Sequence, residues 1–102
     1  MNKVIRGGRV AVVISTGHGG GWYSWHGFLE LLFDPQVVEM VTQGIDHKII
    51  AQYCVRVYGD DCTYNTENLS VRWVPEKAKF FIHEYDGWES IVLETNIMWI
   101  QA

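Results

Sequence analysis

The segment Gly17 to Gly27, GHGGGWYSWHG, combines residue types that bind nucleotides, hold metals or move protons. Because glycine lacks a Cβ atom, its five glycines let a ligand approach the backbone and leave peptide N–H groups open to a phosphate. The two tryptophans and one tyrosine of the segment offer flat faces that stack on a base. The composition is therefore typical of a nucleotide-binding loop.

Two common phosphate-binding motifs do not match this segment. A P-loop requires a lysine and a serine or threonine after its last glycine, whereas Gly21 is followed by Trp22 and Tyr23. A dinucleotide-binding fingerprint that starts at Gly17 requires a third glycine at position 22, which is tryptophan. Any phosphate site here is thus expected to have another geometry.

The histidines of the segment suggest two further chemistries, and neither is supported. The sequence His18-Gly19-Gly20-Gly21 matches the oxyanion-hole motif of lipases, but the chain contains no GxSxG nucleophile motif and is too short for that fold. His18 and His26 stand eight residues apart without further ligands at a zinc-binding spacing. We therefore expect no catalytic residue, metal or other cofactor.

Two interpretations of the segment remain open. In the first, it forms a ligand pocket in which glycine N–H groups bind phosphate and aromatic rings stack on a base. In the second, Trp22 and Trp25 anchor the loop to the core and the glycines only permit the turn. The residues of the predicted pocket are His18, Gly19, Gly20, Gly21, Trp22, Tyr23, Trp25 and His26.

A two-residue Asp86-Gly87 turn predicts a hairpin in which Glu84 lies directly opposite Glu89. Two carboxylates at such positions repel each other. We expect either that the pair lies at a solvated rim, or that an arginine or the donor groups of a ligand neutralise it. Arg72, on a neighbouring predicted strand, is expected to point to the opposite face.

The Gly7-Gly8 turn predicts a second hairpin, which places Arg6 opposite Arg9. Paired guanidinium groups bind phosphates or carboxylates, although such a hairpin tip is often simply solvated. A contact of Arg6 or Arg9 with Glu84 or Glu89, within one chain or between copies, would neutralise both like-charged pairs. We therefore include Arg6, Arg9, Arg72, Glu84 and Glu89 among the candidate ligand-binding residues.

The hydrophobic pattern predicts a single α+β domain over residues 1–102. We expect an N-terminal β-hairpin, two helices that begin after Asp34 and Asp46, and a C-terminal antiparallel four-stranded meander. The expected strands cover residues 3–5, 10–15, 69–74, 79–85, 88–94 and 97–101, and a short helical turn covers residues 28–33.

Composition narrows the class of partner. The formal net charge of −4 argues against duplex nucleic acid as a ligand, because phosphate binding needs clustered lysine and arginine. No apolar run is long enough to span a membrane, and two isolated cysteines without a signal peptide indicate a cytoplasmic protein. With 14% aromatic residues in so small a chain, we expect homo-oligomers that bury part of the aromatic surface.

Three phrases resemble a family of small bacteriophage and prophage proteins, most of them uncharacterised. They are the glycine–tryptophan segment from Gly17 to Trp25, the phrase from Leu32 to Pro35, and the phrase from Glu84 to Ser90. The resemblance covers nearly the whole chain and implies an accessory protein that acts on host physiology in an infected or lysogenic bacterium. By class, such proteins are similar to counter-defence sponges that sequester cyclic or ADP-ribose-type nucleotides.

We therefore predict a non-catalytic protein that binds and sequesters a nucleotide-like signalling molecule. One alternative is an acidic inhibitor that binds a host or defence enzyme through Asp60, Asp61, Glu67 and Glu84. Another is a small enzyme that uses Glu84, Glu89 or His18 as acid or base.

Overall fold

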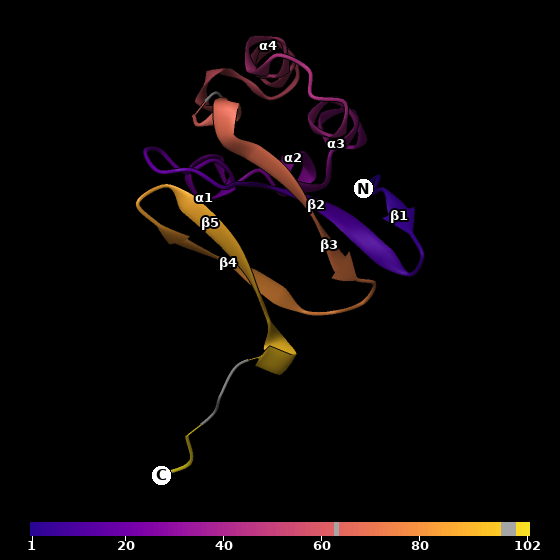
Figure 1. The fold of residues 1–102 in the computed structure, drawn as a ribbon, viewed down its shortest axis with the longest axis vertical. Helices are drawn as coiled ribbons and strands as arrows, with labels where there is room; N and C mark the ends of the chain where they lie inside the picture. Colours follow the sequence, from indigo (N-terminus) through magenta and orange to yellow (C-terminus); the bar gives the residue numbers. More distant parts are fainter. Residues whose placement is uncertain (63, 97–99) are drawn as a thin grey trace.

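The N-terminal hairpin and a strand from the second half of the chain form a three-stranded antiparallel sheet in the order β1-β2-β3 (Figure 1). The computed structural model describes residues 1–62, 64–96 and 100–102. Strands β1 (Ile5–Arg6) and β2 (Arg9–Ser15) flank Gly7 and Gly8, whose φ angles of 56° and 76° confirm the predicted turn. Strand β3 (Leu69–Pro75) pairs with β2 along its whole length.

The predicted four-stranded meander is wrong. Strands β4 (Phe80–Tyr85) and β5 (Trp88–Leu93) form a separate two-stranded sheet, and β3 pairs with β2 instead of β4. Strand β2 is buried at all but its first position, so it needs a full-length partner as well as cover on both faces. That long-range pairing leaves no signal in the local turns. Of the predicted fourth strand, positions 97–99 lie outside the described residues.

Four α-helices lie between β2 and β3 in the described part of the chain, and the two longer ones begin at the predicted caps. They are α1 (Tyr23–His26), α2 (Leu29–Phe33), α3 (Pro35–Thr42) and α4 (His47–Tyr58). The Asp34 side chain accepts hydrogen bonds from the N–H groups of Gln36 and Val37, and Asp46 accepts one from Lys48. The cap assignments from sequence are therefore confirmed, whereas helix α1 within the glycine segment was not predicted.

Helices α3 and α4 cover one face of the three-stranded sheet and the β4–β5 hairpin covers the other (Figure 1). Leu32 and Phe33 of α2 pack on the hairpin side. Along β2, Ala11 and Val13 pack with the helices, while Val12 and Ile14 pack with the hairpin. Both faces of β2 are apolar because each contacts a separate layer. Among the described residues, no helix combines the length and apolar character needed to cross a membrane.

Candidate functional site

Glu89 on β5 is a fully buried carboxylate that joins the hairpin to the glycine segment. Its Oε1 atom accepts a hydrogen bond from the Ser15 N–H at 2.9 Å. Its Oε2 atom accepts bonds from the Trp22 N–H at 3.2 Å, the Ser24 N–H at 2.7 Å and the Ser24 Oγ–H at 2.6 Å. One donor from the end of β2 and three from the glycine segment therefore stabilise the negative charge without a cation.

Neither expectation for the glutamate pair is met, because donors of the protein itself neutralise Glu89. The register does place Glu84 opposite Glu89, as the turn predicts. However, Glu89 does not lie at a solvated rim, and neither Arg6 nor Arg9 of the same chain is among the groups bonded to it. Sequence reasoning missed its serine partner, Ser24; the only available signal was a hydroxyl residue beside the glycines.

The glycine segment is also tied to the Asp86-Gly87 turn. The Gly19 N–H donates to the Asp86 carbonyl at 2.8 Å, and the Ser15 Oγ–H donates to the Gly87 carbonyl at 2.8 Å. A Cβ atom on Gly87 would collide with the backbone of Gly19, so the two loops pass at backbone contact distance. Part of the predicted phosphate-binding backbone is thus engaged within the protein, and Gly21 is buried.

Trp22 is an anchor of the core and does not face a ligand. Its side chain is fully buried, and its indole N–H donates to the carbonyl of Cys62 at 3.2 Å. Trp25 differs, because it is 55% exposed and its ring lies 5.0 Å from that of Tyr64, beside Gly20. The two interpretations of the segment therefore divide between its tryptophans: Trp22 pins the turn, and Trp25 remains available for stacking.

The two histidines of the segment have different environments. His26 packs edge-on against the rings of Trp22 and Tyr23, and its Nδ1 atom accepts the Phe28 N–H at 2.8 Å. Burial lowers the pKa of His26 to about 4, against a smaller opposing effect of the negative charge on Glu89. His18 is exposed, with Nδ1 3.6 Å from an Asp86 oxygen.

The three candidate arginines, Arg6, Arg9 and Arg72, lie on the three-stranded sheet, away from the glycine segment. Arg6 pairs with Arg9 as predicted, and the Arg6 guanidinium lies 5.8 Å from the centre of the Trp73 ring. The expectation that Arg72 faces away from the glutamates is wrong. Arg72 pairs with Val12, whose face packs against the β4–β5 hairpin, so Arg72 and Glu89 line the same groove.

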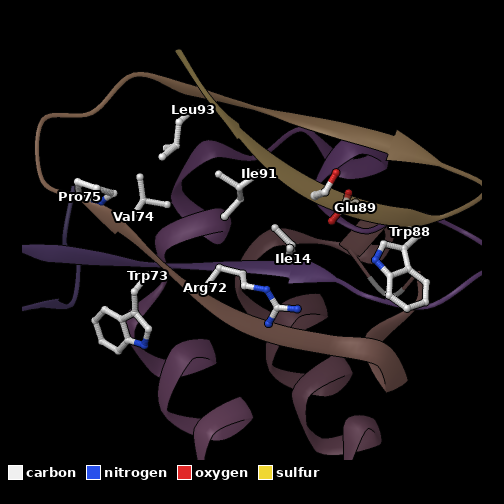
Figure 2. A pocket seen from close by; sticks show the side chains of 10 residues that line it. Ile14, Arg72, Trp73, Val74, Pro75, Trp88, Glu89, Ile91 and Leu93 are labelled. Carbon is white, nitrogen blue, oxygen red and sulfur yellow. The ribbon is translucent and has the colours of Figure 1, made fainter. Parts of the chain in front are cut away.

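This β3–β5 groove, between β3 and β5, has a volume of about 350 Å³. Its apolar walls are Ile14, Val74, Ile91 and Leu93, and the buried Glu89 lies toward the Trp88 end. Figure 2 shows Arg72 and Trp73 along the β3 side and Trp88 at one end, with the Arg72 side chain directed toward that end. Trp73 pairs with Ala11, so its ring lies on the helix side of β3. The groove therefore combines one cation, the Trp88 ring at one end and apolar walls.

The described residues contain no group of three or more histidine, cysteine, aspartate or glutamate side chains that could hold a metal ion. A comparison with known proteins finds no family model, no curated protein and no solved structure that matches the chain. The function must therefore be argued from the chemistry of the groove.

Proposed function

We propose that the β3–β5 groove binds a nucleotide-like small molecule and retains it without chemical change. The observation that carries this proposal is Arg72, an arginine in an apolar groove that the half-exposed Trp88 closes at one end. A guanidinium recognises a phosphate, and an indole face stacks on a base. One groove thus offers a contact for each half of such a ligand.

The charge balance supports an anionic ligand. The chain carries a formal net charge of −4, yet within its described part Arg72 forms no ion pair. The hydrogen bond given by its side chain is a 3.4 Å contact with the carbonyl of the adjacent Val71. Because a weakly bonded guanidinium keeps most of its donors available, a phosphate at this position replaces water without breaking a strong internal bond.

The size and walls of the groove favour a ligand with a flat ring. Its 350 Å³ lie near the lower limit for small-molecule sites, about 300–1,000 Å³. Trp88 is 45% exposed, so it retains open ring surface at the end of the groove. A ligand of mononucleotide size, with one base and one phosphate, matches this volume better than a polynucleotide.

Retention without chemistry is supported by the state of the nearest acidic group. Glu89 is fully buried, and both of its oxygens accept hydrogen bonds from the protein. A general base must reach the proton it removes, and the oxygens of this carboxylate already accept hydrogen bonds from Ser15, Trp22 and Ser24. Sequestration, the role that the phage resemblance implies, requires only such binding.

A thermal-shift panel of mononucleotides, cyclic mononucleotides, cyclic dinucleotides and cyclic ADP-ribose isomers tests the proposal. At least one ligand should raise Tm in a concentration-dependent way, and intact ligand should be recovered after denaturation. Arg72→Ala should weaken binding at least tenfold. Arg56→Ala, which removes the same charge from α4, is the matched control and should leave the affinity unchanged.

Each other outcome contradicts part of the proposal. If no nucleotide binds, the proposed function fails; if the ligand returns cleaved, the protein is an enzyme. If binding is equally strong in Arg72→Ala, the ligand lies elsewhere, and exposed Trp25 becomes the next site to test. Salt-sensitive capture of a basic protein, with no nucleotide binding, would favour the acidic-inhibitor alternative.

A further inference from the structure

We infer that the outer face of the β4–β5 hairpin is the surface on which two copies of this chain associate. This inference does not rest on the proposed ligand, although Trp88 belongs both to this surface and to the groove. In the hairpin register Phe81 lies opposite Val92, His83 opposite Ser90, and Tyr85 opposite Trp88. Directly opposed residues share a face, so these six side chains form one continuous surface, here called the outer face.

The outer face is apolar where the hairpin should be solvated. Alternate residues of β4 face inward and are half-buried, whereas Phe81 and Tyr85 are 49% and 73% exposed. Trp88 beside them is 45% exposed. Clustered exposed aromatic residues on one sheet face are typical of protein–protein interfaces, in which tyrosine, tryptophan and phenylalanine are enriched.

Charge identifies a second copy as the partner. None of the six residues is aspartate, glutamate, lysine or arginine, although 20% of the chain is charged. A nucleic acid or a strongly basic protein gains no electrostatic attraction from a neutral face. Two copies with a net charge of −4 each repel most weakly through their uncharged surfaces, and an isologous dimer brings the same neutral face together twice.

The area available suits a weak dimer. An aromatic side chain buries about 150–250 Å² in full, so the exposed parts of the three rings supply about 330 Å² per copy. Both copies together bury about 650 Å² from the rings, and the flanking His83, Ser90 and Val92 bring the total toward the ~1,000 Å² that a specific interface needs. We therefore expect association that depends on concentration in the micromolar range.

Sedimentation velocity over a concentration series, without added ligand, tests this interface. The wild-type mass should rise reversibly from 11.8 kDa toward twice that value. Phe81→Lys and Tyr85→Lys should each weaken dimerisation at least tenfold, because each removes an aromatic contact and buries a charge in an apolar interface. Neither residue lines the β3–β5 groove, unlike Trp88, so these variants leave the proposed ligand site intact.

Ile49→Lys is the matched control, since Ile49 is 52% exposed on α4, far from the hairpin in the fold. It should dimerise like the wild type, and all three variants should keep the wild-type urea midpoint. A wild-type protein that remains at 11.8 kDa at every concentration would overturn the inference. So would dimers that persist in both hairpin variants, because the interface would then use another face.

Discussion

The amide and the hydroxyl of Ser24 both donate to one oxygen of Glu89, at 2.7 and 2.6 Å, although the two residues are 65 positions apart in sequence. The same carboxylate is fully buried. A buried charge is tolerated only when its hydrogen-bonding capacity is filled, and here Ser15 and the glycine segment fill it. Glu89 therefore fixes the loop on the hairpin.

Glu89→Gln should destabilise the protein strongly. Glutamine keeps the shape of the side chain but replaces one acceptor oxygen with an NH₂ group, which would then face N–H donors. We expect a loss of about 3 kcal/mol in the free energy of unfolding, measured by urea denaturation. Glu94→Gln makes the same change at an exposed position and should alter stability by less than about 0.5 kcal/mol. Equal effects of the two substitutions would show that the buried hydrogen bonds contribute little.

Substitutions of the two tryptophans of the glycine segment should have different effects on stability. Trp22→Leu leaves a cavity in the core and removes the indole donor to Cys62, so the unfolding free energy should fall by about 3 kcal/mol. Trp25→Leu alters a half-exposed ring and should lower it by less than about 1 kcal/mol. Urea denaturation of both variants measures the two losses. A larger loss for Trp25→Leu than for Trp22→Leu would contradict the anchor role of Trp22.

Alanine substitutions at Gly87 and Gly8 distinguish the cost of backbone strain from the cost of a steric collision. Both glycines adopt positive φ angles, of 86° and 76°, so the strain is similar at the two positions. A Cβ atom at Gly8 meets nothing within 4 Å, so Gly8→Ala should lower the free energy of unfolding only by the strain of the left-handed conformation, about 1–2 kcal/mol. Gly87→Ala adds a collision with the Gly19 backbone and should lose about 2 kcal/mol more. Similar losses in thermal or urea unfolding would mean that the loop is not held against the hairpin turn in solution.

Acid should destabilise the fold through His26. Its pKa is about 4 in the folded protein and 6.5 in the unfolded chain, so the unfolded state binds the proton more readily between these values. The contribution of His26 to the free energy of unfolding is therefore fully present above pH 6.5 and decreases as the pH falls toward 4. The His26 Nδ1 atom accepts a backbone N–H, and protonation would set two donors against each other.

His26→Gln keeps an acceptor for that N–H and removes the titrating ring, so it should flatten the dependence of stability on pH between 4 and 6.5. His47→Gln, at an exposed position on α4, serves as the control. Urea denaturation at half-unit pH steps supplies the comparison. An unchanged slope in His26→Gln would assign the acid sensitivity to other groups.

Local sequence signals determined the elements and their ends. Asp34 and Asp46 begin α3 and α4 because a carboxylate satisfies N–H groups that a helix leaves open within a few residues. Asp86-Gly87 and Gly7-Gly8 adopt the positive φ angles of two-residue hairpin turns, which fixes the pairing of Arg6 with Arg9 and of Glu84 with Glu89. These features depend on neighbours in the chain, so composition and spacing suffice to predict them.

Only the tertiary structure decided which surfaces those elements present. The pairing of β3 with β2 joins residues about 60 positions apart, and no local turn encodes it. It places Arg72 in the β3–β5 groove and leaves the outer face of the hairpin exposed. Burial of Glu89 depends likewise on donors from Ser15, Trp22 and Ser24 that meet it only in the folded chain. Long-range contacts assign each side chain to the core, the groove or solvent, because burial depends on the whole fold and not on neighbouring residues in the sequence.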